Sequence, residues 1–212
     1  MKRRSAVDEA RSVRDFWFGQ LPLSAATLNS RIRFWFGDEP TATRQWRDAQ
    51  IRIRFRPLFE RAAGGQLAGW ADGPRRRLSL ILLLDQFPRN LFRGTTRAFA
   101  TDDQALALTL SGMQSAADAA LDVVERIFFY MPLQHAESRE VQDESVAAYR
   151  RLLSEVPAEL RGPFSGALRS AENHRAIIER FGRFPYRNHV LRRASTGPEE
   201  KWLRAGGESF GQ

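Results

Sequence analysis

The 212-residue sequence lacks cysteine entirely and has only two lysines, Lys2 and Lys201. The absence of cysteine excludes disulfide bonds, thiolate nucleophiles and cysteine-ligated zinc or iron–sulfur centres. Long apolar runs are also missing, since none approaches the ~18 residues of a membrane-spanning helix. The N-terminal Met1-Lys2-Arg3-Arg4 is basic, but it leads into polar residues rather than the apolar segment of a signal peptide. We therefore expect a cytoplasmic protein that does not enter a membrane.

Signals for β-strands are scarce too, because sustained alternation of apolar and polar residues is missing and β-branched residues are few. Helical signals recur instead, as capping residues, apolar positions spaced three or four apart, and stops at glycine or proline. They predict helices over residues 5–19, 44–63, 75–86, 102–112, 119–130, 139–156 and 163–182, and a short last helix from residue 197. About eight helices with short connections are typical of an all-α bundle or a stack of helical hairpins. We expect one domain over residues 1–212.

Two of these helices carry more specific predictions. Thr101-Asp102-Asp103-Gln104 has the pattern of a capping box, so Thr101 is expected to cap the helix that follows. Gly112 is expected to end that helix. Residues 75–86 are apolar on nearly all sides, which predicts that this helix lies in the centre of the domain.

Arginine supplies nearly all of the positive charge, and the net charge of +8 is unevenly distributed. Residues 31–77 and 161–193 each carry a net charge of +6, whereas residues 85–155 carry −4. Opposite signs within one domain predict that arginines of the flanking segments pair with carboxylates of the middle one. A basic surface also attracts nucleic acid. No recognised nucleic-acid module accompanies the charge, so we do not expect nucleic acid as a partner.

Two distant segments nearly repeat one motif: Phe87-Pro88-Arg89-Asn90 and Phe184-Pro185-Tyr186-Arg187-Asn188. Each joins a helix-stopping proline to an arginine and an asparagine, which form directional hydrogen bonds. If these two corners lie side by side, their guanidinium groups can bind the carboxylate or phosphate of a ligand. The residues that we expect to bind it are Asp85, Arg89, Asn90, Arg93, His174, Arg183, Arg187 and Asn188. Alternatively, the arginines pair with Asp85, Glu125 or Glu137 and fix helix packing without a ligand.

His135 and Glu137 are the candidates for acid–base catalysis, because imidazole titrates near neutral pH and a buried carboxylate can be shifted toward it. Glu137 or Asp85 would orient the imidazole. No nucleophile motif such as Gly-x-Ser-x-Gly is present. The three histidines show no metal-ligand spacing, so no metal or other cofactor is expected. His174 lies on an apolar helical stripe, which is more typical of a core histidine than of a ligand.

Several longer segments carry a family pattern in the same order along the chain. They are Asp85 to Gly94, Ala98 to Asp102, Tyr130 to Glu137 and His174 to Pro185, with Phe16-Trp17-Phe18-Gly19 near the start and Phe210-Gly211-Gln212 at the end. Together they resemble the bacterial "domain of unknown function 924" family over nearly the whole chain. The resemblance implies an all-helical, tetratricopeptide-repeat-like fold and no established activity. Repeats of about 34 residues are not visible in the sequence itself.

Three positions depart from the family pattern. Gln134 stands where Glu is usual, Ala136 where Ser is usual and Tyr186 where His is usual. A mechanism that needed proton transfer at these positions is therefore in doubt for this chain.

Three functional hypotheses follow. The first is a binding module whose Arg- and Asn-lined pocket takes an anionic small molecule or an acidic peptide segment. The second is a hydrolase of a small anionic substrate, with His135 as base, Glu137 as its orienting partner and the arginines as an electrostatic clamp. The third is a structural scaffold in which all of these residues serve folding. The residues favour binding over catalysis and leave the ligand and the oligomeric state open.

Overall fold

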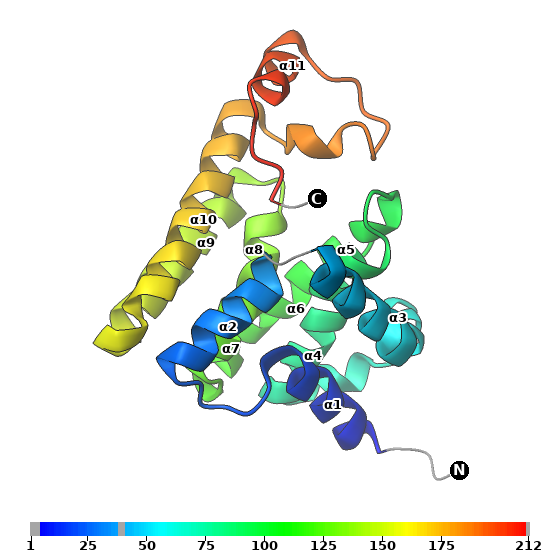
Figure 1. Cartoon of the computed structure of the whole chain (residues 1–212), viewed down its shortest axis with the longest axis vertical. Coiled ribbons are helices and arrows are strands. Elements are labelled where there is room, and N and C mark those ends of the chain that lie inside the picture. Colours follow the sequence, from blue (N-terminus) through cyan, green and yellow to red (C-terminus); the bar gives the residue numbers. More distant parts are fainter. Residues whose placement is uncertain (1–4, 38–40, 211–212) are drawn as a thin grey trace.

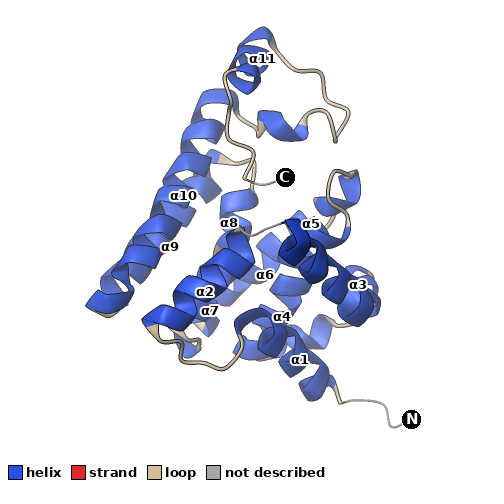
Figure 2. Ribbon diagram, viewed as in Figure 1, coloured by secondary structure: helices blue, strands red, loops and turns tan. Residues whose placement is uncertain are grey.

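The computed structural model describes residues 5–37 and 41–210, and within them all regular structure is helical (Figures 1 and 2). The α-helices are α1 (Ala6–Phe18), α2 (Ala25–Phe36), α3 (Thr41–Ala63), α4 (Pro74–Ile81), α5 (Phe87–Leu91), α6 (Asp102–Gln114), α7 (Val123–Phe129), α8 (Met131–His135), α9 (Arg139–Glu155), α10 (Arg161–Phe181) and α11 (Gly197–Arg204). The prediction of an all-α fold is confirmed. None of the described helices has the length and apolar character needed to cross a membrane.

Helix α2 is not among the predicted helices, although its boundary signals are present. The Ser24 side chain accepts a hydrogen bond from the backbone of Thr27, and Gly37 follows the helix with a left-handed φ of 62°. Most of its large apolar residues gather at one end, in Phe34-Trp35-Phe36, so the helical periodicity is weak. The short helices α5 and α8 are also not among the predicted helices. Each contains a proline, and in the sequence a proline indicates the end of a helix. Proline is tolerated there since it lies in the first helical turn.

Helix α6 corrects both predictions about its ends. Thr101 precedes the helix, but its side chain does not cap it. The buried Thr101 hydroxyl instead donates to the Leu84 carbonyl at 2.5 Å. The helix also continues past Gly112 to Gln114. Gly112 is a site of close approach, because a Cβ atom there would lie 2.5 Å from the Phe129 ring of α7.

The core is built around a cluster of aromatic rings contributed by helices that are distant in sequence. Phe128 of α7 is fully buried, and its ring lies 5.5 Å from both Trp17 and Phe18 of α1. Its ring centroid is 4.7 Å from Trp35 of α2 in an edge-on arrangement. The Trp35 indole N–H donates to the Trp17 carbonyl at 2.9 Å. This cluster therefore joins α1, α2 and α7 through both apolar and polar contacts.

Helix α4 lies in the middle of the molecule, as predicted, and packs against α1, α6 and α7. It continues into a π-helical turn, η2 (Leu82–Gln86), and then into α5. All five side chains of the π-helical turn are buried. A π-helical turn widens the helix by one residue per turn and is frequent at functional sites. Here it carries Asp85 and Gln86.

Helices α9 and α10 form a long antiparallel pair beside this core, and α11 lies near one end of the pair (Figure 1). From α11 the chain returns toward the middle of the molecule, drawn in red in Figure 1. Phe210 stacks there on His174 of α10, with ring centroids 3.6 Å apart. The C-terminal segment therefore contributes to the same region as α8 and α10.

We expect Phe128→Ala to lower the free energy of unfolding by about 3–5 kcal/mol, because it removes a fully buried ring and leaves a cavity among its neighbours. Urea denaturation followed by circular dichroism measures this change. The control is Ile53→Ala, at an apolar side chain that is 74% exposed, which should change stability by no more than about 0.5 kcal/mol. Equal effects of the two substitutions would contradict the assignment of the core.

Candidate functional site

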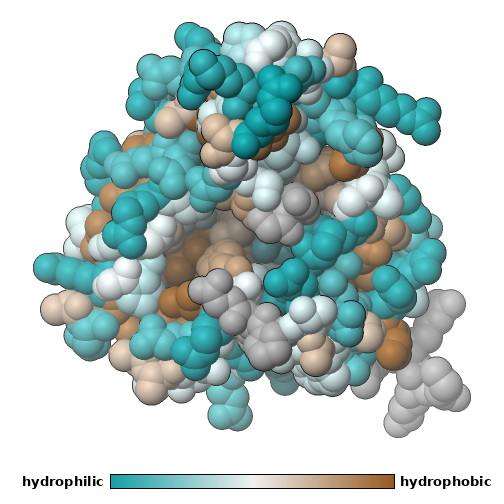
Figure 3. All heavy atoms as spheres, turned by 45° about the horizontal axis from the view of Figure 1, so that its top comes forward, coloured by the Kyte–Doolittle hydropathy of each residue, from teal (hydrophilic) through white to brown (hydrophobic). Residues whose placement is uncertain are grey.

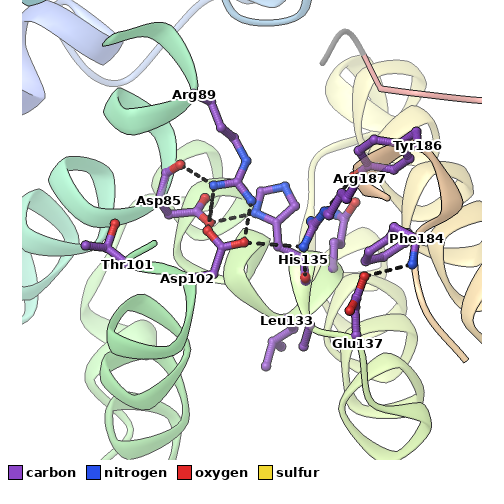
Figure 4. Close-up of polar contacts among 12 residues, drawn as sticks. Asp85, Arg89, Thr101, Asp102, Leu133, His135, Glu137, Phe184, Tyr186 and Arg187 are labelled. Atoms are coloured by element: carbon purple, nitrogen blue, oxygen red, sulfur yellow. Dashed lines mark hydrogen bonds and ion pairs between the residues drawn. The ribbon is translucent and has the colours of Figure 1, made fainter. Parts of the chain in front are cut away.

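The two Pro-Arg-Asn corners come together at the carboxylate of Asp102, the first residue of α6. Arg89 donates to both Asp102 oxygens, with Nη1–Oδ1 and Nη2–Oδ2 distances of 2.8 and 3.0 Å. Arg187, in the short helix η6 (Pro185–Arg187), reaches Asp102 Oδ2 from its Nη1 at 3.5 Å. Figure 4 shows both arginines directed toward this carboxylate. The shared partner is thus an acidic residue of the protein itself.

Arg89 is almost completely enclosed, with 6% of its surface exposed. It donates a further hydrogen bond from Nη1 to the Asp85 carbonyl at 2.6 Å. Burial by itself lowers the pKa of the Arg89 guanidinium, but the carboxylates of Asp102 and Asp85 outweigh burial and raise it. Arg89 is therefore a permanent buried cation whose charge is neutralised from within.

Arg187 is equally buried, with 4% of its surface exposed. Its Nη1 donates to the His135 carbonyl at 3.1 Å. Its guanidinium carbon lies 4.5 Å from the centre of the Phe184 ring and 4.7 Å from that of Phe99, distances typical of cation–π contacts. Arg187 thus ties the second corner to the end of α8.

Asp85 and His135 form a hydrogen-bonded pair beside Arg89. His135 Nδ1 lies 2.6 Å from Asp85 Oδ1, and the Gln86 amide donates to Asp85 Oδ2 at 2.5 Å. Burial alone raises the pKa of Asp85, but His135 and Arg89 lower it well below its ordinary value. The pKa of His135 is lowered, first by burial and then by Arg89. At neutral pH the pair therefore consists of an ionised carboxylate and a neutral imidazole.

The proton of this neutral imidazole lies on Nδ1, since an ionised carboxylate only accepts hydrogen bonds. The second ring nitrogen, Nε2, consequently carries a lone pair. Among the residues that the structure describes, no group hydrogen-bonds to His135 Nε2. Aspartate that orients a histidine in this way is a common element of acid–base sites.

A cavity of about 490 Å³ opens beside His135. Its wall is mainly aromatic and apolar, from residues that include Trp17, Ile32, Trp35, Phe36, Ile127, Met131, Tyr186 and Phe210. The polar part of the wall comprises Arg44, Arg47, Gln86, Arg89, Asn90, Arg93, Gln134, His135, Ser170 and His174. Four arginines and no acidic residue occur among the described residues of this wall. Figure 3 shows a hollow with a hydrophobic interior and a largely hydrophilic rim on this side of the molecule.

Trp17, Asn90 and His174, three residues that line this cavity, each have a buried polar atom without a hydrogen-bond partner within the described residues: Trp17 Nε1, Asn90 Oδ1 and His174 Nε2. Buried polar groups are nearly always hydrogen-bonded in native structures, so each exception requires an explanation. His174 Nδ1 donates to the Ser170 carbonyl at 2.8 Å, which leaves Nε2 as an acceptor. Burial, followed by the neighbouring His135, lowers the pKa of His174 to about 3. His174 is therefore neutral at physiological pH.

The expected ligand-binding residues divide into two groups. The wall of the cavity includes Arg89, Asn90, Arg93 and His174. Asp85 does not line the cavity, but it contacts His135, which does. Arg183, Arg187 and Asn188 are not among the residues that line it. Arg183 binds both oxygens of Glu199 on α11, at 2.7 and 2.8 Å. Asn188 donates to Ser195 and accepts from Arg193, each at 3.1 Å.

Glu137 does not contact the His135 ring. Its carboxylate accepts from the Phe184 backbone N–H at 2.8 Å and from the Arg193 guanidinium at 2.6 and 3.0 Å. Of the two orienting partners considered from sequence, Asp85 is the one that the structure places on His135. Glu137 instead holds the second Pro-Arg-Asn corner against the end of α8.

Several residues of the site were not found by sequence reasoning. The capping-box pattern places Asp102 only at the start of a helix. A carboxylate in the first helical turn can also bind arginine side chains, as Asp102 does here. Trp17 was visible only as part of an aromatic run. For Gln86, the one feature of the sequence that indicates a place in the site is its position next to Asp85. For Arg44, no feature of the sequence does so.

The fold and this cavity define an all-helical protein with one aromatic-walled, arginine-bearing site. A family model described as "Bacterial protein of unknown function (DUF924)" matches residues 13–207, and the chain belongs to this family. It is similar to a solved structure of a protein of unknown function, ATU0120 from Agrobacterium tumefaciens. The two share 35% sequence identity with a TM-score of 0.77, over 95% of this chain and 100% of the other. A search of functionally curated proteins found no significant match.

Asp102→Asn should lower the free energy of unfolding by about 3–5 kcal/mol, because two buried guanidinium groups lose their shared countercharge. The measurement is urea denaturation at neutral pH. Asp143→Asn provides the matched control, since Asp143 pairs with Arg175 on the surface. An exposed pair contributes at most about 1 kcal/mol. A loss for Asp102→Asn no larger than for the control would show that this carboxylate does not organise the site.

Two histidines whose pKa values are lowered in the folded protein, His174 and His135, predict that stability is lost in mild acid. A histidine whose pKa is lowered from 6.5 to about 3 by folding, as for His174, binds its proton first in the unfolded chain. The free energy of unfolding should therefore fall as the pH drops below about 6.5, with a slope approaching 1.4 kcal/mol per pH unit for each such group. His135 acts in the same direction. We expect His174→Gln to reduce the slope between about pH 6.5 and 5, whereas the exposed His189→Gln should not. Identical slopes in wild type and His174→Gln would refute this linkage.

Proposed function

We propose that the protein binds a small anionic metabolite with an apolar or aromatic body in the cavity beside His135. The cavity volume of about 490 Å³ lies within the range of sites for small molecules. Its mixture of apolar walls with a few polar groups is also typical of such sites. An acidic peptide segment is less well accommodated, because the aromatic side chains of α1, α2 and the C-terminal segment surround the space.

The observation that carries this proposal is that three residues lining one cavity each have a buried polar atom without a hydrogen-bond partner among the described residues. Trp17 Nε1 offers an N–H donor, while Asn90 Oδ1 and His174 Nε2 offer acceptors. They come from α1, α5 and α10, which are separate elements of the fold. A ligand that carries both a hydrogen-bond acceptor and a hydroxyl or amino donor matches the chemistry of these three groups. The protein's own structural polar groups nearby, such as Asp102 and Arg89, are paired with each other instead.

The charge of the wall supports an anion. Arg44 lies on the exposed part of the wall, at the start of α3, and no ion pair to it occurs among the described residues. Guanidinium groups bind carboxylates and phosphates through paired hydrogen bonds. The ligand class that fits these features is a small carboxylate or phosphate that also carries a hydroxyl or amino group.

We expect members of this class to raise the melting temperature of the protein, because a ligand stabilises the folded state in proportion to its binding. A thermal-shift screen with hydroxy and amino carboxylates and phosphate monoesters of aliphatic and aromatic compounds tests this, followed by calorimetry on the hits. Arg44→Gln should weaken binding roughly fivefold, the effect of losing one exposed ionic contact. Arg52→Gln is the matched control, an exposed arginine of the same helix outside the cavity wall.

Asn90→Leu should weaken binding further, because the acceptor oxygen on the wall is lost. A complete absence of shifts over this panel, or equal affinities of Arg44→Gln and Arg52→Gln for every hit, would refute the proposed site.

A further inference from the structure

The geometry around His135 points to a chemical role for the cavity beyond binding. We infer that His135 is the general base of a hydrolase, which activates water against an ester or amide bond of a small carboxylate. This inference rests on the proposed binding function of the cavity. In this inference Asp85, not Glu137, orients His135, because the structure contains the contact between His135 and Asp85.

The His135 imidazole is held in one orientation at the cavity. Asp85 is fully buried and holds Nδ1 at 2.6 Å, so the ring presents Nε2 on its opposite edge. His135 itself lines the cavity, and 12% of its side chain is exposed. In Figure 4 the ring lies between Arg89 and Arg187, with one nitrogen bound to Asp85. A lone pair held in fixed orientation at a ligand cavity is the requirement for a general base.

The groups that hold His135 are themselves fixed by several contacts. Asp85 is fixed from three sides, by His135, by the Gln86 amide, and by Arg89 Nη1 at 3.5 Å from its Oδ1. The backbone carbonyl of His135 is held by Arg187. Orienting groups of this kind keep a catalytic base in position without reorganisation during the reaction.

The side chains at the cavity decide which nucleophile the site can use. The chain has no cysteine. Among the described residues on the cavity wall, Ser170 is the one hydroxyl of a serine or threonine, and it donates to Gln134 Oε1 at 3.0 Å. Water is therefore the nucleophile that the site supports.

The oxygen of a water molecule forms a bond to the carbonyl carbon of the substrate while its proton moves to His135 Nε2. The bond between that carbon and the leaving oxygen or nitrogen then breaks, and the leaving atom takes the proton from His135. The products are a carboxylic acid and an alcohol or amine. Asp85 stabilises the transient imidazolium and remains ionised.

The charged groups around the imidazole come from every element packed against it. Asp85 in η2 and Asp102 in α6 favour its protonation, whereas Arg89 in α5 disfavours it. His174 in α10 lies with its ring centroid 6.1 Å away, and Arg187 in η6 holds the backbone carbonyl of His135. Activity should therefore fall in acid, as His135 gains a proton, and should be independent of pH from about 7 to 8.

The first experiment uses bromoacetate as a probe of Nε2 in the wild-type protein. In this reaction the nitrogen lone pair bonds to the CH₂ carbon and bromide leaves. Peptide mass spectrometry should find carboxymethyl groups on His135 before the exposed His189, since the cavity concentrates the anion. Neutral bromoacetamide should react more slowly with His135. No thiol competes, because the chain lacks cysteine. Labelling of His189 in preference to His135 would overturn the inference.

The second experiment measures turnover of the 4-nitrophenyl monoester of succinate, with 4-nitrophenyl acetate as the uncharged comparison. His135→Gln should lower kcat by about 100-fold or more, the usual contribution of a general base, while His189→Gln should leave it unchanged. Glutamine at position 135 can still donate to Asp85, which protects the fold. Asp85→Asn should lower kcat with little change in KM and alter the pH profile, as expected of a positioning residue.

The outcomes separate this inference from the proposed binding function. Turnover no faster in wild type than in His135→Gln would overturn the hydrolase, and carboxylates that still raise the melting temperature would leave the binding site intact. If carboxylates neither raise the melting temperature nor protect His135 from bromoacetate, both proposals fail together.

Discussion

A single carboxylate, that of Asp102, holds two buried arginines, Arg89 and Arg187, that come from segments distant in the sequence. Arg89 and Arg187 are each more than nine-tenths buried, and a buried guanidinium is very costly without an ionised partner. By meeting at Asp102, the segments after α4 and after α10 are fixed relative to α6. The same two arginines also bind the Asp85 and His135 carbonyls. The position of the Asp85–His135 pair therefore depends on this shared countercharge.

Polar groups around this centre fall into two kinds that differ in what satisfies them. Asp102, Glu137 and Glu199 are matched by arginines of the protein and stabilise its folding. On the cavity side, polar atoms of Trp17, Asn90 and His174 have no partner among the described residues. The first kind explains the arginine-rich composition without a ligand. The second kind distinguishes the cavity from ordinary packing defects, because an accidental void would be lined by apolar atoms.

Membership of the family defines the architecture but leaves the chemistry to be argued from the site. The solved relative from Agrobacterium tumefaciens shares the fold and is itself described as a protein of unknown function. Folds host many unrelated activities, so an activity must be inferred from the geometry of particular residues. In this chain that geometry is an aspartate-oriented imidazole at the edge of an aromatic, arginine-bearing cavity. Binding and hydrolysis use the same wall, and they differ in whether His135 Nε2 only accepts a hydrogen bond or also takes a proton.

The sequence by itself determined the helical class, most helix positions and the residues of the two Pro-Arg-Asn corners. These follow from caps, glycine stops and apolar spacing, which act over a few neighbouring residues. Only the tertiary structure decided that Asp102, 85 positions away from Arg187, is the partner of both corners, and that Asp85 rather than Glu137 orients His135. It also placed Arg89 and Asn90 on the cavity wall, whereas Arg187 and Asn188 do not line the cavity. Several carboxylates suit an arginine equally well in sequence, and only packing selects the one that lies within hydrogen-bond distance.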